Sequence, residues 1–121
     1  MIKLFKQKEI EVTNKEEFEK TLTRLIELLR DNAFSAQADA VRRVLAALLN
    51  SDTDKFLKTI NSVDMWGGSG AVWEVYGFQT KEDEKEFWSQ IIRLTDLMKE
   101  INIKNNHAYS TAKIFKTELN K

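Results

Sequence analysis

Apolar residues recur along this chain at steps of three and four, and no proline interrupts them. In an α-helix this spacing gathers the apolar side chains on one face, which is buried against a neighbouring element. Average proline usage of about 5% would give about six prolines in a chain of this length. Long uninterrupted helices are therefore permitted, and the pattern predicts an all-α fold.

The periodic stretches predict about five helices. The clearest stripe consists of Phe18, Leu22, Leu25, Ile26 and Leu29. The first helix is expected over about residues 14–30, and the second starts near residues 33–35 and continues to about residue 49. A short third helix has a buried face from Phe56 to Val63, a fourth begins at Thr80 and continues to about Ile101, and a last helix extends from about Ala108 to the C-terminus. In the third, Val63 is expected on the buried face. With 121 residues and no inter-domain linker, the chain is predicted to form one domain over residues 1–121, a single bundle with a loop rich in glycine and aromatic residues between helices three and four.

Polar residues mark where these helices begin. Thr13 with Glu16, and Thr80 with Asp83, have the spacing of a capping box. The stretch "NSDTD", residues 50–54, interrupts the second helix and supplies caps for the third. Before the first helix, residues 1–12 contain two short alternating stretches around "KQKE", which predict an N-terminal hairpin or an irregular arm.

The composition restricts the possible functions. Nineteen basic and nineteen acidic residues cancel, so the broad positive charge that favours nucleic-acid binding is missing. The absence of cysteine excludes disulfides and thiolate chemistry. No apolar run approaches the roughly 20 residues that span a bilayer, and the first twelve residues lack the apolar core of a secretory signal. We expect a cytoplasmic protein without a nucleic-acid or membrane partner.

One segment does not fit the helical pattern: "DMWGGSGAVWEV", residues 64–75, with three of the four glycines of the chain. In one interpretation its glycines are structural. Gly67 and Gly68 would end the third helix in a left-handed conformation, and Gly70 would allow a close approach of the backbone.

The second interpretation is that the segment presents a protein-binding surface, because aromatic residues and methionine are typical interface anchors. The candidate partner-binding residues are Trp66, Ser69, Trp73, Glu74 and Tyr76. If "AVWEVYGF" is extended, Glu74 and Tyr76 lie on one side and Trp73 on the other. The sequence leaves open whether the stretch from Trp73 to Tyr76 faces the core or a partner.

Catalytic and metal-binding patterns are incomplete. "GGSGA" is one residue short of the nucleophile elbow around Ser69, but a helical pattern rather than a strand precedes it, and His107 is the only histidine available as a base. A phosphate-binding loop would need a following lysine, which is missing. The acidic residues of "DTD" lack the later ligands of a calcium loop. We therefore predict no catalytic, cofactor-binding or metal-binding residues.

The stretch "MWGGSGAVWEV", followed by "EKEFWSQIIRLTDLMKE", resembles a family of small uncharacterised bacterial all-helical proteins. These proteins carry a loop of the form GG-G-S/A-apolar-apolar-D/E and are similar to immunity proteins encoded beside bacterial toxins. The resemblance covers about residues 15–120 and brings no catalytic residues with it. This chain differs from the commoner "GGMGSLND" form at Ser69, Val72, Trp73 and Glu74.

Together these observations favour a non-enzymatic binding protein, and the resemblance implies an immunity protein that neutralises a cognate toxin domain by direct binding. Two alternatives stay open. One is a small-molecule-binding or hydrolytic protein that uses the loop from Gly67 to Glu74, with His107 as a candidate base. The other is a structural homo-oligomer, since the sequence does not determine the oligomeric state.

Overall fold

The protein folds as an all-α single domain in a computed structural model that describes residues 10–121. Five helices of eight residues or more are joined by a one-turn helix, α4, and a 3-10 turn, η1, and residues 10–121 contain no strand. The elements are α1 (Lys15–Asp31), α2 (Ser35–Leu49), α3 (Thr53–Ile60), α4 (Val63–Trp66), η1 (Val72–Glu74), α5 (Lys81–Glu100) and α6 (Asn106–Leu119). The predicted all-α fold with about five helices is confirmed.

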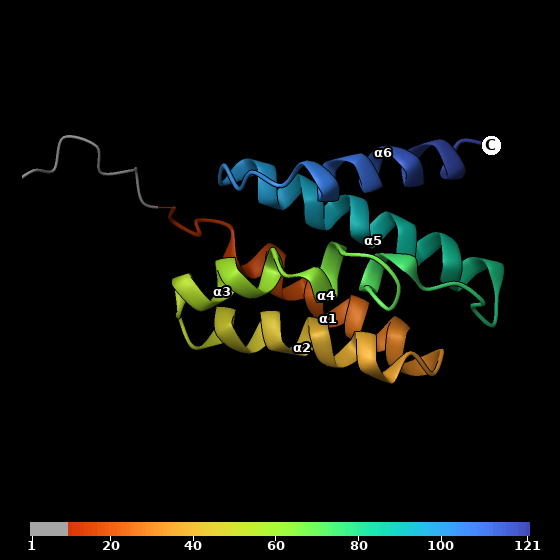
Figure 1. The fold of residues 1–121 in the computed structure, drawn as a ribbon, viewed down its shortest axis with the longest axis horizontal. Coiled ribbons are helices and arrows are strands. Elements are labelled where there is room, and N and C mark those ends of the chain that lie inside the picture. The colour runs from red at the N-terminus through yellow and green to blue at the C-terminus, as the bar shows by residue number, and fades with distance from the viewer. Residues whose placement is uncertain (1–9) are drawn as a thin grey trace, which may run out of the picture.

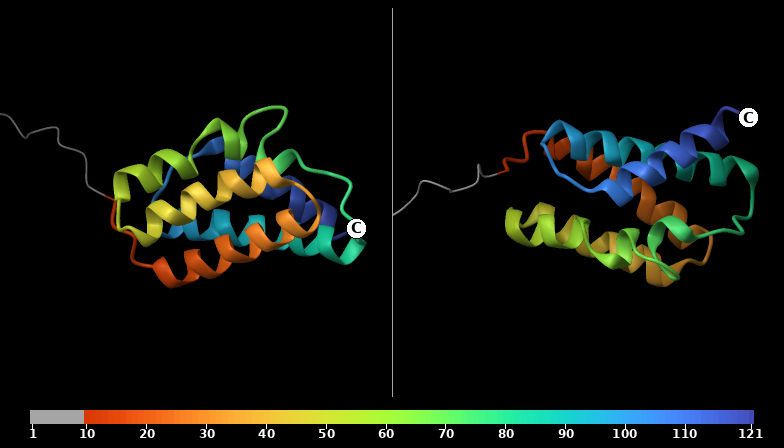
Figure 2. Two further views of the ribbon diagram at one scale, coloured as in Figure 1. Left: turned by 90° about the horizontal axis from the view of Figure 1, so that it is seen from below. Right: turned by 45° about the horizontal axis from the view of Figure 1, so that its top comes forward.

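The helix α1 packs against both α5 and α2, α6 packs on α5, and α3 packs on α2 (Figure 1). The link between α1 and α2 is three residues long, which makes these helices an antiparallel pair. The segment that joins α4 to α5 crosses the side of α2 that faces away from α1 (Figure 2, left). This placement brings the glycine-rich segment against the beginning of α2.

One apolar core connects all five long helices. Its largest fully buried side chains come from α1, α3, α4 and α5: Phe18, Phe56, Phe87, Leu22, Leu25, Leu28, Leu29, Ile60, Met65, Ile91, Leu94 and Leu97. The helix α2 adds the buried Val41 and Val44, and α6 adds Ala108 and Phe115. The rings of Phe18 and Phe56 meet edge to face, with their centroids 5.2 Å apart. Each buried leucine, isoleucine or phenylalanine contributes about 1.5–3 kcal/mol relative to an exposed one, so the periodic stripe stabilises the fold.

Two of the three predicted helix starts are correct. The Asp52 side chain accepts a hydrogen bond from the Lys55 amide at 3.1 Å, and Thr80 Oγ1 accepts one from the Asp83 amide at 3.0 Å. The capping box at Thr13 is wrong, because α1 begins after Asn14. The buried Asn14 side chain instead donates to the Leu97 carbonyl, which joins the start of α1 to the end of α5.

One further expectation needs correction, and another lies mostly outside the described residues. Val63 is 77% exposed, because α3 ends at Ile60 and a turn at Asn61 and Ser62 starts α4 in a new direction. The arm or hairpin predicted for residues 1–12 falls mostly outside the described residues. Its described part, Ile10–Val12, forms no strand, and Ile10 and Val12 pack partly buried against the core.

Candidate functional site

The glycine-rich segment follows two buried side chains of α4. In α4, Met65 is fully buried and Trp66 is only 2% exposed. The indole nitrogen of Trp66 donates to the Ile60 carbonyl at 2.7 Å, which satisfies its one polar atom inside the core. Trp66 therefore fills the bundle and offers no surface to a partner, in contrast to its place among the candidate partner-binding residues.

Gly67 and Gly70 each have a structural reason for glycine, but their roles differ from the predicted ones. Gly67 does not have a left-handed backbone, since its φ is −71°. A Cβ atom at Gly67 would lie 2.7 Å from the Val63 carbonyl oxygen, so this is the position of close backbone approach. Gly70 has the left-handed conformation, with φ at +88°, and open space where its Cβ would be. At Gly68 the structure gives neither reason for glycine.

Trp73 holds the segment in place. Its indole nitrogen donates to the carbonyls of Trp66 at 3.1 Å and Gly67 at 2.9 Å, which closes the loop back on α4. Val72 is fully buried beside it in η1. The alternation expected for an extended strand is wrong, because this 3-10 turn breaks it. Trp73 is thus half-buried and anchors the loop.

The loop is also held against α2. Gln37 Nε2 donates to the Gly70 carbonyl at 3.0 Å. Phe34 packs edge to face on Phe78, with ring centroids 5.2 Å apart. Hydrogen bonds and ring packing thus hold the loop against both α4 and the start of α2.

Tyr76 is the exposed side chain that this anchoring displays. It is 83% exposed and borders a shallow pocket of about 440 Å³, which we call the loop pocket. The residues that line the loop pocket are Phe34, Gln37, Ser69, Gly70, Ala71, Glu74, Val75 and Tyr76. The structure brings together three of the predicted partner-binding residues: Ser69, Glu74 and Tyr76. Phe34 and Gln37 were not predicted, since they lie more than thirty residues away in the chain and only the fold places them here.

The hydrolytic alternative depends on a base close to Ser69. His107 is exposed at the start of α6 and is not among the residues that line the loop pocket. Its ring packs edge to face on Trp73, with centroids 5.9 Å apart. Within residues 10–121 no hydrogen bond joins Ser69 to His107, so the nucleophile and base pairing of a catalytic triad is not formed here.

Charged residues surround the loop pocket unevenly. Arg43 pairs with Asp64 at 3.3 Å, and these two residues border a smaller pocket of about 260 Å³ on the other side of Gly70. Arg42 pairs with Asp39 at 2.5 Å. Glu74 is the one charged residue that lines the loop pocket, and no ion pair of residues 10–121 includes it.

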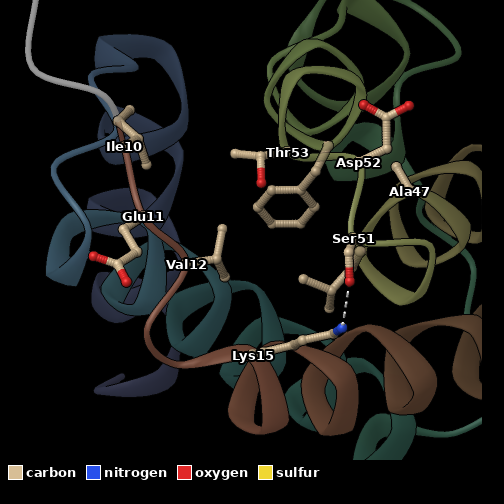
Figure 3. A pocket seen from close by; sticks show the side chains of 10 residues that line it. Ile10, Glu11, Val12, Lys15, Ala47, Ser51, Asp52 and Thr53 are labelled. Carbon is tan, nitrogen blue, oxygen red and sulfur yellow. Dashed lines mark hydrogen bonds between the residues drawn. The ribbon is translucent and has the colours of Figure 1, made fainter.

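A second hollow of about 380 Å³ lies at the opposite end of α2, between Ile10–Val12 and Ser51–Thr53 (Figure 3). Three of its polar side chains already have partners. Lys15 Nζ donates to Ser51 Oγ at 3.3 Å, as the dashed line in Figure 3 shows, and Asp52 caps α3. We take the loop pocket as the candidate site, because Ser69, Glu74 and Tyr76, three of the predicted partner-binding residues, line it.

Residues 10–121 contain no group of three or more His, Asp and Glu side chains that could hold a metal ion. Nor does this part of the chain contain a helix long and apolar enough to cross a membrane. Comparison with protein-family models, curated proteins and solved structures gives no match for this chain. The resemblance to immunity-type proteins therefore stays a prediction.

Proposed function

We propose that this protein is a non-enzymatic binding protein that engages a protein partner through the surface around Tyr76. The observation that carries this proposal is an aromatic side chain, 83% exposed, on a loop held by the two hydrogen bonds of the Trp73 indole. Aromatic residues beside a pocket are typical interface anchors. A loop fixed in advance loses little conformational entropy on binding, which favours affinity.

We further propose that the partner is a bacterial toxin domain, which the protein neutralises by direct binding in the cytoplasm. This step depends on the resemblance carried by Gly67, Gly68, Gly70 and the residues that follow. It is compatible with neutral net charge, because a toxin that is not a nuclease does not require an acidic inhibitor.

The test is co-expression with the toxin domain encoded beside the gene, with cell growth and complex formation as readouts. Wild type is expected to restore growth and to elute with the toxin as one complex. Tyr76→Asp should abolish both, because a charge replaces the exposed ring. The matched control is Leu49→Asp, which changes a side chain 50% exposed at the other end of α2 and should leave both unchanged.

Absence of rescue and complex by wild type would refute the toxin proposal, and full rescue by Tyr76→Asp would refute the assigned surface. The solution mass of the chain alone separates this function from a structural homo-oligomer, which would assemble without a partner.

A small molecule in the loop pocket is the second candidate, because about 440 Å³ is within the range of ligand sites and both Ser69 and Glu74 line it. Thermal-shift screening distinguishes the two. A stabilising compound whose effect is lost in both Ser69→Ala and Glu74→Ala would favour the small molecule over the protein partner.

A further inference from the structure

The charge of the loop pocket is one-sided. Glu74 lines it, whereas no lysine, arginine or histidine does. Arg43, which lines the neighbouring pocket, is already paired with Asp64, and Arg42 is paired with Asp39. A carboxylate without a nearby cation favours a positively charged group from outside the molecule.

The other polar groups of the loop pocket also suit a hydrogen-bond donor. Gln37 uses its amide nitrogen on the Gly70 carbonyl, so its amide oxygen is the atom left to accept a bond. Ser69 is exposed and its hydroxyl can accept as well. The lining of the loop pocket thus offers hydrogen-bond acceptors from three side chains, Gln37, Ser69 and Glu74.

The apolar part of the loop pocket fits a long, flat side chain. Tyr76 presents an exposed aromatic ring, on which a guanidinium group can stack. Phe34 and Val75 line the same pocket and are half-buried, so they can cover an aliphatic stem. Arginine combines the stem, the planar cation and five donors, and it is enriched at protein interfaces.

We infer that the loop pocket receives an arginine side chain of the protein partner, which pairs with Glu74 and stacks on Tyr76. This inference rests on the proposed function, because it assigns the partner's chemistry at the same surface. Glu74 supplies charge and Tyr76 supplies the stacking face. Gln37 and Ser69 accept the remaining guanidinium hydrogens.

The experiment uses the full chain and two capped amino acids as probes, N-acetyl-arginine methylamide and its neutral isostere N-acetyl-citrulline methylamide. Amide chemical shifts are followed by NMR at constant low ionic strength. The arginine probe should move the signals of residues 69–76 and the Gln37 side-chain amide. Glu74→Gln should weaken its binding about two- to fivefold, the range for a partly exposed ion pair. The citrulline probe should bind wild type more weakly by a similar factor.

The matched control is Asp64→Asn, which removes a carboxylate that borders the neighbouring pocket and is paired with Arg43. It should leave the affinity for the arginine probe unchanged. Tyr76→Phe should retain the affinity for the arginine probe and Tyr76→Leu should reduce it, because stacking needs the ring and not the hydroxyl.

The inference is overturned if neither probe moves these signals, if both bind equally, or if Asp64→Asn weakens binding as much as Glu74→Gln. These failures are separate from failure of the proposed function. A toxin complex that depends on Tyr76 but tolerates Glu74→Gln would support the proposed function and refute the inference of a partner arginine. Binding of the arginine probe by a chain that fails to rescue growth would support the arginine site and refute the toxin proposal.

Discussion

Gly67 is the glycine whose replacement we expect to damage the fold most directly by steric overlap. A Cβ atom there would lie 2.7 Å from the Val63 carbonyl oxygen and 3.0 Å from Val63 Cβ. The oxygen belongs to the backbone of α4, and it accepts the Gly67 amide at 2.7 Å, so it cannot move away without loss of that bond. Gly67→Ala must therefore shift the start of the loop.

The cost has two parts. Overpacking of a tight site costs about 1–3 kcal/mol. A shift of the Gly67 carbonyl also weakens the hydrogen bond from the Trp73 indole, 2.9 Å long, which contributes about 1 kcal/mol. Alanine restricts the unfolded chain and returns about 0.4–1 kcal/mol. We expect Gly67→Ala to lower the free energy of unfolding by about 2 kcal/mol, or the melting temperature by about 8 °C at this chain length.

The assay is chemical denaturation followed by tryptophan fluorescence, with Gly68→Ala as the matched control. A Cβ at Gly68 meets no atom within 4 Å, and Gly68 is not among the residues with positive φ. Because both variants restrict the unfolded chain equally, their difference isolates the overlap at Gly67. Equal stability of the two variants, or a larger loss in Gly68→Ala, would refute the reasoning.

Three further predictions concern stability. Ala33→Gly should raise the free energy of unfolding by about 0.5–1 kcal/mol in urea denaturation. Ala33 lies two residues after the end of α1 with φ at +66°, which costs alanine about 1–2 kcal/mol and glycine nothing, and the freer unfolded chain of glycine offsets about 0.4–1 kcal/mol of that gain; no gain would contradict this. The Arg24 guanidinium, 2.5 Å from Glu86, holds the pKa of that carboxyl below its usual range, so the pair should stabilise the fold above about pH 4.5 and lose this effect as the pH falls through the folded pKa. Glu86→Gln should flatten that part of the stability profile, with a loss near 0.5–1 kcal/mol at pH 7. Tyr109→Phe removes the hydroxyl that donates to the Ile103 carbonyl and should cost about 1 kcal/mol in thermal denaturation; an unchanged melting temperature would show that this bond is unimportant.

The helical fold could be predicted from the sequence because helix periodicity is local. The stripe from Phe18 to Leu29 and the cap at Thr80 depend on residues three or four apart, and both are as predicted. The predicted start of α1 was wrong, because a contact with a distant helix decides which residue stands there. Asn14 replaced Thr13 at the start of α1, since its amide meets the Leu97 carbonyl of a helix more than eighty residues away.

The glycine-rich segment shows the same division. Its glycines, its aromatic residues and its place between two helices follow from the sequence alone. Gly67 is the glycine with no room for a Cβ atom because the Val63 carbonyl lies beside it. Trp66 and Trp73 turn inward because their indole nitrogens donate to backbone carbonyls, which leaves Tyr76 as the exposed aromatic residue. The loop pocket exists only because α2 brings Phe34 and Gln37 beside Glu74 and Tyr76. Local spacing thus determined the helices, and tertiary packing decided the surface they present, because burial and long-range hydrogen bonds are properties of the folded chain.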